Sequence, residues 1–143
     1  MSETKLLIHV LWSTKNQKKC LNKEILDQIL FHIIETAKSN SIQIYELNGC
    51  ADHLHALIRL HSTQSLAQVI HNIKGEVSNW INTQKLTKEV FEWQEGYNAV
   101  SISPSCKAML KKYFRKHELK HVTLSYLQEV RLLKRDLLFP NTT

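Results

Sequence analysis

Two histidines at alternate positions are the residues whose spacing first indicates chemistry. His53 and His55 flank Leu54 in a mostly apolar stretch. In a β-strand, residues i and i+2 share a face, so both imidazoles would project to the same side and could converge on one divalent ion. The chain contains eight histidines, so a chance pair on a solvated sheet face explains the spacing equally well. Asp52 can orient an imidazole as an outer carboxylate or can simply form a turn.

A tyrosine and another histidine form a second candidate group. Tyr113 and His117 are four residues apart, which places them one turn apart on the same face of a helix. One interpretation is an amphipathic helix whose Tyr and His are half-buried. The other is a tyrosine nucleophile for a phosphodiester, with His117 as a further metal ligand and the surrounding basic residues binding phosphates. These basic residues are Lys111, Lys112, Arg115, Lys116 and Lys120.

The two groups complement each other chemically. A phenol with a pKa of about 10 is a poor nucleophile at neutral pH. It therefore needs a phosphate that a metal ion has polarised, and the histidine pair would supply that ion.

The composition favours a polyanion as partner. The 143 residues include 19 Lys and Arg against 13 Asp and Glu, giving a formal net charge of +6 and a pI near 9.3. An apolar content of 43% excludes disorder as the main state. A small, basic, histidine-rich domain is typical of proteins that bind nucleic acid.

The chain has the pattern of a single intracellular domain over residues 1–143. No apolar run approaches the roughly 20 residues of a membrane span, and the N-terminus does not resemble a signal peptide. The three cysteines lack metal-type spacing and are interpreted as reduced thiols, mostly small buried hydrophobes. We therefore expect a cytoplasmic protein without a membrane partner.

The N-terminal half of the chain predicts a strand, a helix and a hairpin. Asn22 is a good N-cap, and apolar residues then recur at three- and four-residue spacing to about Asn40. In the first hairpin strand, alternation places Ile42, Ile44 and Glu46 on one face, and Tyr45 and Leu47 on the other. The predicted strands span residues 5–12, 42–48 and 53–60.

The C-terminal half adds helices and one strand. A helix from Ser62–Ser65 to about Asn82 contains Gly75, which suggests a close backbone contact there. Residues 83–96 appear irregular, with Phe91 and Trp93 anchoring them. A strand at 99–102 precedes helices at about 103–121 and 123–138. The resulting order is the α+β, ferredoxin-like split βαβ arrangement on an antiparallel sheet, with extra C-terminal helices that carry the tyrosine.

Four segments, in order along the chain, together resemble the single-tyrosine HUH transposases, the small transposases of minimal insertion sequences and their repeat-associated relatives. A strand with His-hydrophobic-His followed by a helix with Tyr is the core of this resemblance. Its collinearity over nearly the whole chain is more specific than any one motif. The matching segments are residues 9–15 (HVLWSTK), 50–58 (CADHLHALI), 73–75 (IKG) and 93–103 (WQEGYNAVSIS).

The resemblance implies roles for individual residues. His53 and His55 would be metal ligands and Tyr113 the nucleophile. The family's third ligand is usually a Gln four residues after the Tyr, and here that position is His117. Lys116 stands where a polar Asn is common. The implied ion is Mg²⁺ or Mn²⁺, and three imidazoles shift the preference toward Mn²⁺ or softer ions. The other histidines, assigned to structure or surface, are His9, His32, His61, His71 and His121.

The resemblance also implies partners. The family acts on single-stranded DNA with hairpin ends and forms homodimers in which the tyrosine helix of one subunit can complete the other subunit's site. The candidates for DNA contact are the basic loop from Lys15 to Lys19, then Lys74, and on the tyrosine helix Lys112, Arg115 and Lys116.

Three hypotheses follow from these residues. The leading one is a metal-dependent tyrosine transposase that cuts and rejoins single-stranded DNA through a 5′-phosphotyrosine. The second, prompted by the departures at residues 116 and 117, is a domesticated or inactive relative that binds DNA or RNA hairpins without cleavage. The third is an unrelated phosphodiesterase that uses the histidine pair for hydrolysis. The sequence lacks the second His-x-His motif that would support it.

Overall fold

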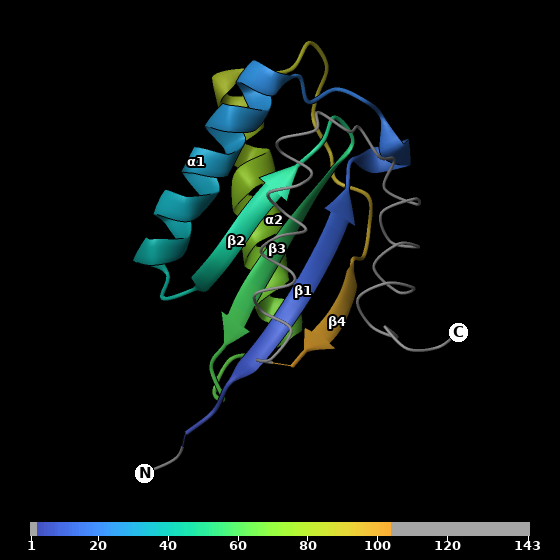
Figure 1. The fold of residues 1–143 in the computed structure, drawn as a ribbon. Helices are drawn as coiled ribbons and strands as arrows, with labels where there is room; N and C mark the ends of the chain where they lie inside the picture. Colours follow the sequence, from blue (N-terminus) through green and yellow to red (C-terminus); the bar gives the residue numbers. More distant parts are fainter. Residues whose placement is uncertain (1–2, 104–143) are drawn as a thin grey trace, which may run out of the picture.

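The structure is a computed structural model that describes residues 3–103 (Figure 1). The prediction of one domain over residues 1–143 stays a prediction, because it extends beyond this range. So do the two C-terminal helices and the residues placed on the first of them, Lys112, Tyr113, Arg115, Lys116 and His117, all of which lie outside the described residues. The elements are β1 (Leu6–Ser13), a short 3-10 turn (Lys15–Gln17), α1 (Lys23–Ser39), β2 (Gln43–Gly49), β3 (His53–Leu60), α2 (Leu66–Gln84) and β4 (Asn98–Ile102).

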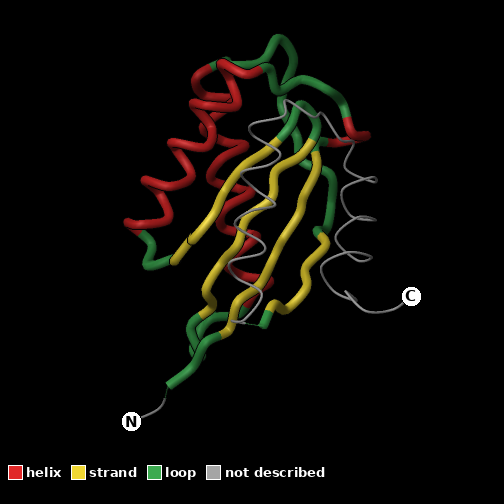
Figure 2. The backbone as a smooth tube through the Cα atoms, viewed as in Figure 1, coloured by secondary structure: helices red, strands yellow, loops and turns green. Residues whose placement is uncertain are grey.

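The four strands form one antiparallel sheet in the order β2-β3-β1-β4. Helix α1 connects β1 to β2 across β3, and α2 connects β3 to β4 across β1, so both connections leave a strand between their ends. Both helices lie on the same face of the sheet (Figures 1 and 2). This arrangement confirms the predicted α+β, ferredoxin-like split βαβ fold.

Each helix begins where the sequence provides a capping side chain. The Asn22 side chain accepts a 2.9 Å hydrogen bond from the backbone N–H of Ile25, and Ser65 accepts one from the N–H of Gln68. Behind these caps, apolar residues at helical spacing face the sheet. The buried positions are Ile29, Ile33 and Ala37 in α1, and Val69, Ile70, Ile73, Val77 and Ile81 in α2.

The helix-facing side of the sheet completes the hydrophobic core. Val10 and Trp12 of β1 and Leu54, Ala56 and Ile58 of β3 are buried against the two helices. Because side chains alternate along a strand, the odd-numbered residues of β1 and β3 must project to the opposite face. No described helix is long and apolar enough to cross a membrane.

The predicted faces of β2 are wrong. The pairing of β2 with β3 shifts between Ile44 and Glu46, where the strand carries a β-bulge. The extra residue changes the phase of the alternation, so Ile44 and Leu47 both pack against the core. Tyr45 instead receives a 3.5 Å hydrogen bond from Arg59. A strict period of two could not anticipate this shift.

The expectation of a close contact at Gly75 is also wrong within the described residues. A Cβ added at Gly75 would meet nothing within 4 Å. The crowded glycine is Gly49, at the end of β2, where an added Cβ would lie 2.9 Å from the His53 carbonyl oxygen and 3.0 Å from Leu26 Cδ1, and would overlap Leu54 Cδ2. The glycine that the fold requires therefore lies beside the histidine strand.

Substitution of the two glycines should have opposite effects. We expect Gly49→Ala to lower the free energy of unfolding by about 1–3 kcal/mol, because the new methyl group meets backbone and packed side chains. Gly75→Ala, the matched control, should raise it by roughly 0.5–1 kcal/mol through helix propensity. Urea unfolding monitored by circular dichroism measures both. If Gly49→Ala is as stable as the wild type, the His53 carbonyl and the side chains of Leu26 and Leu54 can make room for a methyl group, and the predicted crowding is wrong.

Candidate active site

The two histidines of β3 lie side by side on the sheet face opposite α1 and α2. Antiparallel pairing sets His53 opposite Ser13 and His55 opposite Leu11. Both imidazoles are buried, with exposures of 0% and 1%, and their ring centroids are 6.2 Å apart. The structure therefore excludes a solvated polar pair and shows two imidazoles held together in a buried environment.

Asp52 acts on the first of these histidines. Nδ1–H of His53 donates a 2.6 Å hydrogen bond to Oδ1 of Asp52, and the carboxylate is itself 3% exposed. The backbone carbonyl of Asp52 accepts hydrogen bonds from both the N–H and the hydroxyl of Thr14, at 2.9 and 3.2 Å. Asp52 lies in the bend between β2 and β3, and its carboxylate is hydrogen-bonded to His53, so both roles that the sequence left open fit its position. Coordination by His53 would then use Nε2.

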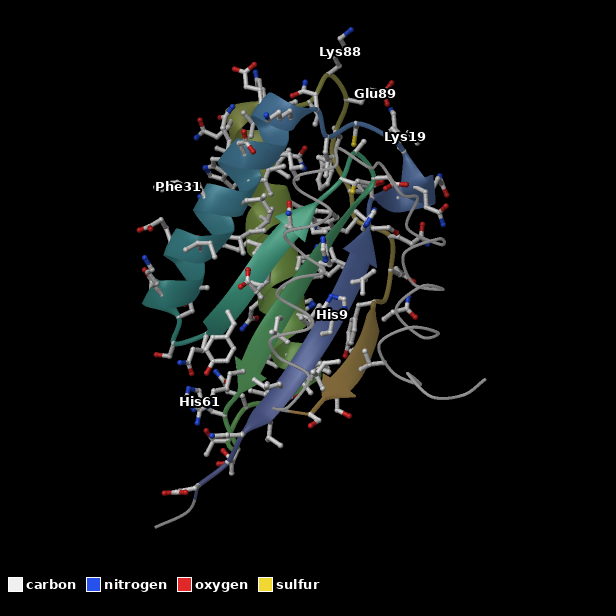
Figure 3. The ribbon with its side chains drawn as sticks, in the orientation of Figure 1. His9, Lys19, Phe31, His61, Lys88 and Glu89 are labelled. Atoms are coloured by element: carbon white, nitrogen blue, oxygen red, sulfur yellow. The ribbon has the colours of Figure 1, made fainter. Side chains whose placement is uncertain are left out.

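His9 is a third histidine on this face, and it was assigned by sequence to structure or surface. It is fully buried on β1, and its ring contacts His55 edge-on, with centroids 5.8 Å apart and planes at 83°. Figure 3 shows His9 midway along β1. Burial lowers the pKa of His9 to about 3, so its imidazole is neutral near pH 7. Only the register of β1 against β3 could have revealed this neighbour.

The described candidates for DNA contact are engaged with the protein. Lys15 forms a 3.0 Å ion pair with Glu92. The ammonium group of Lys74 donates to the carbonyl oxygens of Gln94 and Gly96, at 2.8 and 2.9 Å, and burial lowers the pKa of this group. Lys74 therefore holds the segment before β4 in place, and a DNA contact by either lysine stays a prediction.

The donor chemistry of the histidine pair fits a divalent metal ion. Metal-binding histidines commonly donate their second nitrogen to a carboxylate, as His53 does to Asp52. Within residues 3–103 no group of three His, Cys, Asp or Glu side chains could hold an ion. A complete site would need a further ligand, and the predicted one, His117, lies outside the described residues.

The fold and this site define a class of α+β proteins in which a histidine pair lies on one face of a four-stranded antiparallel sheet, opposite the face that packs against α1 and α2. The chain belongs to the family described as transposase IS200 like, whose sequence model matches residues 2–117. The match includes the histidine pair and extends through Tyr113 and His117. The protein is therefore a transposase of the IS200 type, and the resemblance noted in the sequence is confirmed.

Individual relatives agree with this assignment. The chain is 20% identical to the ISDra2 transposase TnpA of Deinococcus radiodurans over 110 residues, which are 73% of this chain and 79% of that protein. A crystal structure from Deinococcus radiodurans, assigned as a transposase, superposes with a TM-score of 0.66 at 19% identity, covering 80% of this chain and 92% of that one. A repeat-associated (REP) tyrosine transposase bound to a REP hairpin superposes with a TM-score of 0.62 at 18% identity, covering 96% and 88%.

The burial of His9 predicts a pH dependence of stability. Because its pKa falls from 6.5 to about 3 on folding, the unfolded chain binds a proton between these values that the folded chain excludes. The free energy of unfolding is therefore unaffected by the titration of His9 above pH 6.5. As the pH falls from 6.5 toward 3, it decreases by up to about 1.4 kcal/mol per pH unit. The free energy of unfolding of His9→Phe, measured in urea between about pH 4 and 6, should therefore depend less steeply on pH than that of the wild type. The exposed His71→Gln serves as control, and an unchanged slope in His9→Phe would contradict the assignment.

Proposed function

We propose that the protein is a metal-dependent, single-strand DNA transposase that uses Tyr113 as its nucleophile. The observation that carries the proposal is the buried pair His53 and His55, with Asp52 bonded to the first imidazole, in a chain of the IS200-like family. Burying these polar groups costs stability unless hydrogen bonds or metal coordination offset it. Metal coordination is the use that a carboxylate-oriented histidine pair fits best.

The ligand set would combine two parts of the chain. His53 through Nε2 and His55 would contribute from β3, and His117 would contribute from the segment that follows β4. Mg²⁺ or Mn²⁺ held there would polarise a phosphodiester and so make it susceptible to a phenol. Asp52 would keep His53 in the tautomer that presents Nε2, and His9, neutral by burial, would pack edge-on against His55.

The proposed reaction would exchange one phosphodiester bond for another, so the bond energy of the DNA backbone would be conserved. The Tyr113 oxygen would attack the phosphorus and form a 5′-phosphotyrosine, while the bond to the 3′ oxygen breaks. The phenol would lose its proton in this step and the 3′ oxygen would take one up, so that it leaves as a 3′-hydroxyl and no net proton is gained or lost. In the second step, a 3′-hydroxyl from another DNA end would attack the phosphotyrosine and release the phenol. Each bond broken is replaced by an equivalent phosphodiester, so strands are joined without water or ATP.

Hairpin DNA and a second subunit are the proposed partners. The REP tyrosine transposase with a related fold is bound to a REP hairpin, and this chain carries a net charge of +6 that would favour the DNA backbone. We propose that Lys15, Lys74, Lys112, Arg115 and Lys116 contribute to this binding and that the active form is a homodimer.

The proposed nucleophile predicts a covalent product. Incubated with Mn²⁺ and single-stranded oligonucleotides that carry the element's hairpin end, the protein should form an adduct that survives denaturing electrophoresis. Tyr113→Phe should abolish the adduct, whereas Tyr45→Phe, on β2, should leave its yield unchanged. If the wild type binds hairpin DNA but forms no adduct with any cognate end, the chain is instead a hairpin-binding relative, the alternative that residues 116 and 117 suggest.

The role of Asp52 predicts a graded loss of metal affinity. Asp52→Asn should weaken Mn²⁺ binding by about 10–100-fold, the usual effect of removing a carboxylate behind a metal-bound histidine. His53→Ala should weaken it further, because a ligand itself is lost. Asp27→Asn, exposed on α1, is the matched control. Isothermal titration with Mn²⁺ measures all three variants, and equal affinities for Asp52→Asn and the wild type would contradict this role.

A further inference from the structure

A groove of about 790 Å³ lies at the end of the sheet where β1 ends and β3 begins. One wall is the segment after β1, residues 14–25, and the other is the segment after α2, residues 86–92. Figure 3 shows Lys19 on the first wall and Lys88 with Glu89 on the second, at the end of the molecule opposite His61. The sequence placed residues 83–96 in an irregular region and assigned Lys88 no role.

Ion pairs tie the two walls together and determine which charges remain. Lys15 pairs with Glu92, and Lys18 pairs with Glu89, so each of these lysines faces a carboxylate. Lys19 and Lys88 are both exposed, and neither forms an ion pair within the described part of the chain. The positive potential at the rim is therefore concentrated on Lys19 and Lys88.

The lining also contains an apolar part, which we call the floor. It consists of Ile25, Leu86, Phe91 and Val90, the last of which is 81% exposed. A cationic rim above an apolar floor suits a ligand with a flat apolar part and an attached anion. An unpaired nucleotide has this combination, because its base offers an apolar face and its phosphate a negative charge. A stacked duplex offers its phosphates but not its base faces.

The groove is connected directly to the histidine site. Thr14 lines the groove, and its backbone N–H and hydroxyl bond the carbonyl oxygen of Asp52, whose carboxylate orients His53. A strand seated in the groove would therefore lie at the same end of the sheet as His53, where β1 ends and β3 begins. The volume falls within the range of ligand pockets, about 300–1,000 Å³.

We propose that this groove binds unpaired nucleotides of the DNA strand that is to be cut, with their phosphates on Lys19 and Lys88 and a base against the apolar floor. The proposal rests on the proposed function and adds to it a binding site for the single-stranded segment next to the scissile phosphate. The groove includes Lys15 and Lys19 of the basic loop that the sequence singled out, and it adds roles for Lys88 and Val90.

Fluorescence anisotropy with a labelled single strand of about 12 nucleotides tests the charges of the rim. The double substitution Lys19→Glu and Lys88→Glu should weaken binding at least about tenfold and reduce the salt-dependence slope of log K by about 1.4, the contribution of two phosphate contacts. Between about 50 and 200 mM salt, the wild type should then lose about sevenfold more affinity than the variant. Lys5→Glu, a single charge reversal at the other end of β1, should have little effect.

Two further measurements test the floor and the preference for unpaired DNA. Val90→Ser should weaken single-strand binding several-fold without changing the salt slope, because it removes apolar contact and no charge. The same strand annealed to its complement should bind more weakly than the single strand and respond less to Val90→Ser. Circular dichroism of each variant confirms that the fold is retained, as expected for exposed side chains.

The outcomes separate this proposal from the proposed function. If the wild type forms the Tyr113 adduct while the double variant binds single strands with wild-type affinity and slope, the groove proposal is overturned and the transposase function stands. If the groove variants lose binding as expected but no adduct ever forms, the groove stands and the cleavage function fails. The wild type could bind duplex and single strand equally well, and the variants could lose the same affinity for both. That result would identify a general polyanion surface and overturn the choice of unpaired nucleotides.

Discussion

The pairing of β1 with β3 is the constraint on which the rest of the molecule depends. It sets Leu11 opposite His55 and Ser13 opposite His53, and it brings His9 into contact with His55. Because side chains alternate along each strand, a shift of one residue would turn the histidines toward α1 and α2 and move core residues to the other face. Gly49 supports the same register from β2, since no larger residue fits beside the His53 carbonyl and Leu54. The burial of apolar residues against α1 and α2 thus fixes which residues of β1 and β3 project to the opposite face, the histidine pair among them.

The histidine face departs from what stability alone would favour. Three imidazoles and a carboxylate, those of His9, His53, His55 and Asp52, are each at most 3% exposed. Burial disfavours the charged form of His9 strongly enough to lower its pKa to about 3, and the hydrogen bond between Asp52 and His53 offsets only part of the cost of burying polar groups. A concentration of buried titratable groups on one sheet face is typical of a functional site. The fold tolerates it because the hydrophobic core lies on the other face.

The segments at the end of the sheet are irregular but well anchored. The N–H of Gln94 donates to the Ser13 carbonyl at 2.8 Å, and the N–H of Lys15 donates to the Glu92 carbonyl at 3.1 Å, which extends strand-like pairing beyond β1. Trp93 adds an indole hydrogen bond to the carbonyl of Lys74, whose ammonium group returns to the same segment. These contacts position the groove walls relative to the histidine strand, so the charged groove and the histidine pair lie at the same end of the sheet.

The sequence by itself determined the elements and the candidate residues within residues 3–103. Periodicity located both helices and all four strands, and the spacing of His53 and His55 identified the pair, because these are local properties of a helix or strand. The sequence also offered Asp52 as a carboxylate beside His53, because the two are neighbours in the chain. The contact of His9 with His55, the bulge in β2 and the placement of Lys19 and Lys88 around one groove were decided only by tertiary structure. Each depends on register or on segments distant in sequence, and no local pattern records which residue of one strand faces which residue of another.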